Sequence, residues 1–75
     1  MPKIPALTAK KIIQALKKAG FQEDRQKGNH LILINVKTKT RTVVPIHSGK
    51  TIKKSLLGAI IRDAKLSVEE FLKLL

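Results

Sequence analysis

Hydrophobic residues in this chain change their spacing twice, and the order of those changes limits the fold more than any other feature. They recur with the period of a helix between Thr8, a typical N-cap, and Gly20, which favours a helix end. Ser67 and Glu70 have the spacing of a capping box, which predicts a short last helix. A second helical stripe follows Thr51, the expected cap of a helix that should face a sheet, and comprises Ile52, Leu56, Ala59, Ile60 and Ala64.

Between the two long helical segments, three short runs have the composition of strands. Residues 30–36 and 41–46 are rich in Leu, Ile, Val and Thr and are too short for independent helices, which favours a pair of strands. Residues 21–26 are expected to form a polar edge strand that ends in a turn at residues 27–29. Pro45 cannot donate to a ladder and should mark a strand end or edge. The expected fold is α+β, ordered α-β-β-β-α with a short extra C-terminal helix, and its antiparallel sheet has helices on one face.

Charge is the feature that bears most directly on function. The chain has 16 Lys and Arg against 5 Asp and Glu, a formal net charge of +11, which favours a polyanionic partner such as nucleic acid. An acidic membrane or an acidic protein would match the charge equally well. Phe21 and Phe71 are the only aromatic residues, so a platform for stacked bases is not expected. With 75 residues, we expect one domain spanning residues 1–75.

Several classes of site and location are disfavoured by what the sequence lacks. There is no cysteine, which excludes disulfides and thiolate metal sites, and the histidines and carboxylates have no metal-ligand spacing. No phosphate-binding glycine loop is present either, so we expect neither a metal nor a cofactor. No apolar run is long enough for a signal peptide or a membrane span, which predicts a cytoplasmic protein with no membrane partner.

Proton transfer near neutral pH would depend on two histidines, His30 and His47. His30 follows a Gly28-Asn29 turn in a basic setting with Arg25 and Lys27. The glycine would let a phosphate approach the backbone closely, and the two cations could hold it there. The alternatives are structural: His30 could cap a carbonyl at a strand end, and His47 could anchor its loop by a hydrogen bond. Pairing of the second and third strands would bring both histidines to one end of the sheet, close to a lysine cluster.

That cluster is formed by Lys50, Lys53 and Lys54 at the start of the second long helix. Unpaired N–H groups and the positive end of the dipole favour anions there, so cations cost helix stability, and this favours a phosphate-binding role. The alternative is a solvated charged turn.

The order and spacing of these pieces resemble the HicA family of toxins, which are mRNA interferases of toxin–antitoxin pairs. The resemblance is carried by residues 18–21, 25–30 and 44–47, and by the lysine-bearing helix followed by residues 66–71. Gly28-Asn29-His30 stands where the family has Gly-Ser-His, so the histidine is kept and the serine is replaced. The resemblance implies a fold like the double-stranded RNA-binding domain, a catalytic His30, an mRNA substrate, and a cognate HicB-type antitoxin that blocks the active face. An acidic antitoxin surface would complement the basic chain.

Cleavage of RNA without a metal needs a base for the 2′-hydroxyl, cations for the charge on phosphorus, and an acid for the leaving oxygen. His30 is the candidate base, Lys27, Lys50 and Lys53 are candidates for charge stabilisation, and His47 or a lysine could be the acid. Two other classes stay open: a non-catalytic module that binds double-stranded RNA through the same lysines, and a basic adaptor for an acidic protein. Only the enzyme needs His30 beside Gly28.

Overall fold

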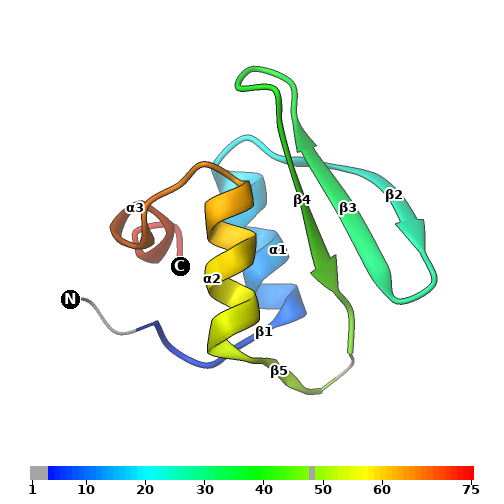
Figure 1. The fold of residues 1–75 in the computed structure, drawn as a ribbon, viewed down its shortest axis with the longest axis vertical. Helices are drawn as coiled ribbons and strands as arrows, with labels where there is room; N and C mark the ends of the chain where they lie inside the picture. Colours follow the sequence, from blue (N-terminus) through cyan, green and yellow to red (C-terminus); the bar gives the residue numbers. More distant parts are fainter. Residues whose placement is uncertain (1–3, 48) are drawn as a thin grey trace.

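A computed structural model describes residues 4–47 and 49–75, and its main elements follow the predicted order (Figure 1). Helix α1 is followed by the antiparallel sheet β2-β3-β4 and then by helices α2 and α3. The bounds are α1 Ala9–Lys18, β2 Gln22–Lys27, β3 His30–Asn35, β4 Thr40–Pro45, α2 Lys54–Asp63 and α3 Val68–Leu72. The predicted α+β fold, like a double-stranded RNA-binding domain with a short extra C-terminal helix, is therefore confirmed.

Local signals set both ends of α1, as predicted. The Thr8 hydroxyl accepts a hydrogen bond from the Lys11 amide at 3.4 Å, which satisfies one of the free N–H groups of the first turn. At the other end, Gly20 has a φ of 105°, and the amides of Gly20 and Phe21 donate to the carbonyls of Lys17 and Leu16. This is the Schellman arrangement that a glycine makes possible, because a side chain is strained at that φ.

The predicted start of α2 was wrong. Thr51 and Ile52 form a short strand, β5 (Thr51–Ile52), which pairs with β1 (Leu7–Thr8) ahead of α1. Pairing keeps the backbone of Thr51 extended, so the helix begins only at Lys54, with Lys53 as an N-cap that makes no side-chain hydrogen bond. Thr51 therefore does not cap α2, because it pairs with Thr8, a residue far from it in sequence.

Helices α1 and α2 both pack against β4 and cover one face of the sheet (Figure 1). Alternate residues of β3 and β4 point to that face, and Leu31, Leu33 and Val44 are buried in the core there. The core also takes both aromatic rings, Phe21 and Phe71, so neither is exposed to stack on a base. The other face of β3 and β4 includes Ile32 and Val43, which are half-buried, and at one corner of the sheet the pair formed by exposed His30 and buried Pro45.

No helix in residues 4–47 and 49–75 is long and apolar enough to span a bilayer.

Candidate functional site

The position of His30 is fixed by the backbone at one corner of the sheet. His30 is the first residue of β3 and pairs with Pro45, the last residue of β4, as the predicted strand ends require. The Ile46 amide donates to the Asn29 carbonyl at 2.6 Å and extends the pairing past the strand ends. On the other side, Lys27 pairs with His30 across a two-residue turn in which Gly28 has a φ of 55°. The backbone of His30 is therefore paired on both sides, which fixes the place at the sheet corner from which its imidazole extends.

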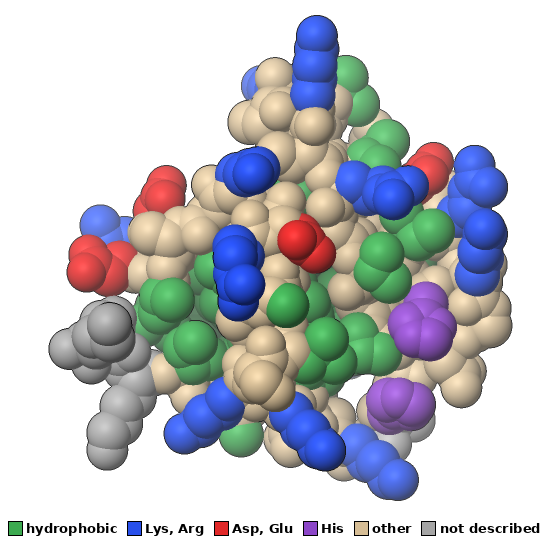
Figure 2. Space-filling model, in the orientation of Figure 1, with side chains coloured by type: hydrophobic (Ala, Val, Ile, Leu, Met, Phe, Trp, Pro, Cys, Tyr) green, Lys and Arg blue, Asp and Glu red, His purple; other side chains and the backbone are tan. Residues whose placement is uncertain are grey.

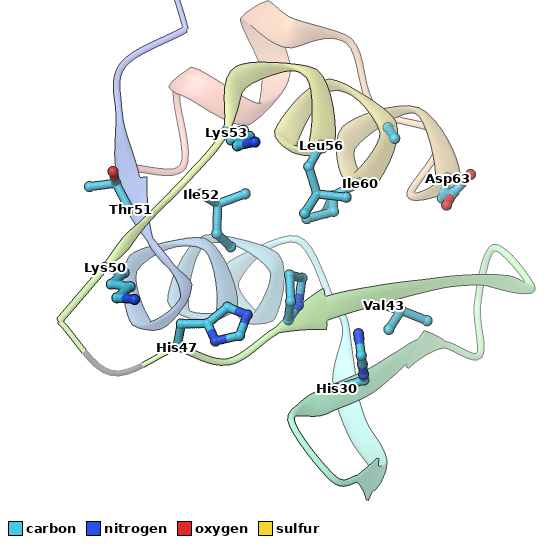
Figure 3. Close-up of a pocket in the computed structure, with 12 residues that line it drawn as sticks. His30, Val43, His47, Lys50, Thr51, Ile52, Lys53, Leu56, Ile60 and Asp63 are labelled. Atoms are coloured by element: carbon cyan, nitrogen blue, oxygen red, sulfur yellow. The ribbon is translucent and has the colours of Figure 1, made fainter.

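A hollow of about 570 Å³ lies between this corner and α2 (Figure 3). His30 lines it from the sheet, His47 from the connection after β4, and Lys53 from the start of α2. Lys50, predicted at the helix start, lines it from the connection ahead of β5 instead. Its remaining lining is mostly apolar, provided by Val43, Pro45, Ile52, Leu56, Ala59 and Ile60. Figure 2 shows the two histidines beside each other, next to hydrophobic side chains on the same face of the molecule.

Among the described residues, neither imidazole makes the structural hydrogen bond that sequence reasoning left open. Both are exposed, and the hydrogen bonds found within residues 4–47 and 49–75 include none from either imidazole. Ser48, predicted to belong to the loop with His47, lies outside the described residues. Both rings therefore have ring nitrogens available for a ligand in the hollow.

The lysine cluster divides into two parts. Lys50 and Lys53 line the hollow, as the phosphate-binding prediction requires, whereas Lys54, the first residue of α2, does not. All three are exposed. Since Lys53 occupies the N-cap without a side-chain hydrogen bond, the first N–H groups of α2 receive no cap from it. Lys53 and the uncapped start of α2 thus border the hollow together, and Lys50 lines it from the connection ahead of β5.

Arg25 and Lys27 lie outside the hollow but share the sheet face of His30. In regular pairing from the turn, Lys27 pairs with His30 and Arg25 with Ile32, and the register shifts only beyond Arg25, toward Glu23. Directly paired residues point to the same face of a sheet, so Arg25 and Lys27 share the face of His30. Gly28, in the turn beside them, has open space where a side chain would be.

Sequence reasoning missed the apolar wall and one carboxylate. Leu56 was expected on the buried stripe of α2 but is 42% exposed at the hollow, because α2 turns Leu57, Ile60 and Ile61 into the core instead. Asp63, the last residue of α2, also lines the hollow. Only the three-dimensional approach of α2 to β4 brings these residues to the site, so no local pattern could have indicated them.

Groups of three or more His, Cys, Asp or Glu that could hold a metal ion are not found among the described residues.

Comparison with known proteins identifies the class to which this arrangement belongs. The model of a family described as the HicA toxin of bacterial toxin–antitoxin systems matches residues 9–66, which include α1, the sheet, α2 and every residue named above for the hollow. The chain belongs to the HicA toxin family, as its sequence pattern indicated. Members are toxins that are generally ribonucleases, and membership implies an antitoxin partner. None of the curated proteins compared with the chain matches it.

Proposed function

We propose that this toxin cleaves mRNA as a metal-independent endoribonuclease with His30 as its catalytic base. The observation that carries the proposal is the convergence of two exposed imidazoles and two lysines on one open hollow. Acid–base groups and cations are what in-line transfer at a phosphodiester requires, and an uncapped helix start adds N–H donors for the phosphate. Residues 1–75 would act as a single RNA-cleaving domain.

Each group has a separate task in the proposed reaction. His30 takes the proton from the 2′-hydroxyl, whose oxygen then attacks the adjacent phosphorus. Lys50 and Lys53 stabilise the charge that grows on the phosphoryl oxygens, and His47 or a lysine gives a proton to the leaving 5′-oxygen. General acid–base help of this kind contributes about 10² to 10⁴ in rate, so positioning must supply the rest.

The outer cations would bind phosphates on either side of the bond that is cut. Arg25 and Lys27 follow the sheet face away from His30, and Lys54 stands beyond the hollow at the start of α2. Next to Lys27, the Gly28 turn leaves space for a sugar–phosphate backbone to approach His30. These three cations thus serve affinity, whereas Lys50 and Lys53 serve both affinity and rate.

The implied antitoxin is proposed to be of the HicB type and to cover this same face in the cytoplasm. A net charge of +11 favours a partner with an acidic surface, since opposite potentials speed the encounter of two proteins. A partner seated over the hollow would exclude RNA from His30.

Controlled induction in a bacterial host tests the proposal. Expression of the wild-type chain should stop growth and degrade mRNA, and His30→Ala at the same protein level should do neither. Growth arrest with intact mRNA from both proteins would instead support a non-catalytic double-stranded RNA-binding module, which the lysines at the start of α2 would also suit.

A further inference from the structure

Among the residues that the structure describes, Asp63 is the only carboxylate that lines the hollow, and its position is unfavourable in two ways. It lies at the C-terminal end of α2, where the negative end of the helix dipole disfavours an anion. It also faces a site whose other charged groups suit a phosphate, which a carboxylate repels. Within the described residues, Asp63 forms no ion pair and no hydrogen bond through its side chain that would account for it.

The hollow separates Asp63 from the cations along the length of α2 (Figure 3). Lys53 and Asp63 stand at opposite ends of this ten-residue helix, about 15 Å apart along its axis at 1.5 Å per residue. His30 rises from β3 between these ends. A phosphate at the lysine end therefore leaves the Asp63 end free for another part of the same ligand.

Apolar side chains form the walls near Asp63. Leu56 on α2 and Val43 on β4 line the hollow with part of their surface exposed, and Ile60 lines it while being itself almost fully buried (Figure 3). A flat ring can lie between such walls, because aliphatic side chains pack against both of its faces and neither face needs a hydrogen-bond partner. The ring's edge would then meet the carboxylate, which only accepts hydrogen bonds and so requires N–H donors.

We propose that the Asp63 end of the hollow binds one unpaired RNA base through its Watson–Crick edge and prefers guanine. The proposal deepens the proposed function and rests on it for the identity of the ligand as RNA. Guanine offers N1–H and N2–H side by side to the two carboxylate oxygens, a bidentate and charge-assisted arrangement. Adenine and cytosine each present one amino group next to an acceptor nitrogen. Uracil presents one N–H between two carbonyl oxygens, which the carboxylate repels.

The size of the preference follows from known base contacts. A good bidentate pair discriminates against the wrong base by about tenfold to a hundredfold. Unpaired bases are the part of RNA that proteins read in this way, since a paired base has its edge occupied. Asp63 would therefore set where along an unpaired strand His30 meets a 2′-hydroxyl.

Binding of uncleavable RNA tests this separately from the chemistry. Hexanucleotides of 2′-fluoro RNA, five uridines with one variable position, lack the attacking hydroxyl, and their affinities for the full chain can be compared by fluorescence anisotropy. We expect the guanine hexamer to bind the wild-type protein about tenfold more tightly than all-uridine RNA. Asp63→Asn should reduce this ratio to about twofold or less and improve adenine, which matches an amide. In NMR spectra, the methyl chemical shifts of Val43, Leu56 and Ile60 should change when the guanine hexamer binds.

The matched control is Glu69→Gln, which makes the same change in charge at an exposed site in α3 and should keep the guanine preference. Equal affinity of the wild-type protein for all bases, no measurable binding of any hexamer, or a guanine preference that survives Asp63→Asn would overturn the proposal. Cleavage of ordinary RNA is measured alongside. Cleavage without a base preference would contradict the base site but support the proposed function. A base preference without cleavage would contradict the proposed function but support the base site.

Discussion

Helices α2 and α3 begin in opposite ways. At the start of α3, the Ser67 hydroxyl accepts from the Glu70 amide at 3.0 Å, the Glu70 carboxylate accepts from the Ser67 amide at 2.9 Å, and Glu69 adds a second acid in the first turn. At the start of α2, Lys53 provides no cap and Lys54 follows it, with no acid in the first turn. One start suits the helix dipole and the other opposes it.

The difference shows where the chain gives up stability. Helix α2 is held by packing, since Leu57, Ile60 and Ile61 are buried and the Thr42 hydroxyl donates to the Ile60 carbonyl. Its first turn is therefore free to carry cations at a small local cost of stability. That turn is also the one that borders the hollow with His30, whereas α3 does not reach the hollow. In the function proposed above, an anionic ligand would be attracted by the same lysines that oppose the helix dipole.

Making the start of α2 resemble that of α3 should have the largest effect. Lys53→Asp places an acceptor at an N-cap whose backbone is already extended, so the free energy of unfolding should rise by about 1 kcal/mol. Affinity for RNA should fall by about a hundredfold, because the change removes one phosphate contact and adds a repulsion. Denaturant melts and RNA titrations check both effects. A variant that gains stability and keeps its affinity would show that Lys53 does not meet a phosphate.

Comparing Lys50→Ala with Lys54→Ala sharpens the division of the lysine cluster. Each variant should flatten the log–log salt dependence of RNA binding by about one unit. At saturating RNA, however, cleavage should slow by about tenfold or more only for Lys50→Ala, since Lys50 lines the hollow and Lys54 does not. Rates measured under single turnover separate affinity from chemistry, and equal rates for the two variants would contradict this division.

Removing the cap of α3 should change stability alone. Ser67→Ala takes away the acceptor for the Glu70 amide and should lower the free energy of unfolding by about 1 kcal/mol, or the melting temperature by about 4–8 °C. RNA affinity and cleavage should stay at wild-type values below the transition. A loss of RNA binding in the folded variant would tie α3 to the site and end the contrast between the two helices.

A smaller, pH-dependent effect should come from Glu70. Hydrogen bonds from the Ser67 amide and hydroxyl hold the pKa of Glu70 below its usual value. The folded state thus binds this proton less readily than the unfolded chain, so the stabilisation is complete above the ordinary glutamate pKa and is lost as the pH falls through the folded value. Melts of the wild type and Glu70→Gln should converge in acid, and a constant difference across that range would argue against the capping box.

Local signals in the sequence determined much of the fold. Thr8, Gly20 and the Ser67–Glu70 pair act within one turn of their own helix, and all of them did what their spacing predicted. The start of α2 was misplaced because the pairing of Thr51 with Thr8 joins segments that are far apart in sequence.

The candidate site was predictable only in part for the same reason. The strand ends indicated that His30, His47 and Lys50 would meet, and all three line one hollow. The bulge after Glu23 and the approach of Asp63 could not be foreseen, because register and helix packing depend on contacts across the whole sheet. Which of the assembled groups perform chemistry stays a prediction.

Single-turnover cleavage of one RNA by wild-type, His30→Ala and His47→Ala proteins, in buffer containing EDTA, tests the central claim most directly. The wild-type chain should cleave without divalent metal, His30→Ala should be slower by about 10² or more with near wild-type RNA affinity, and His47→Ala should lose less. Circular dichroism of each variant shows whether it is folded. A folded His30→Ala protein that cleaves at the wild-type rate, or wild-type activity that disappears in EDTA and returns with Mg²⁺ or Zn²⁺, would contradict the assignment of the chemistry to His30.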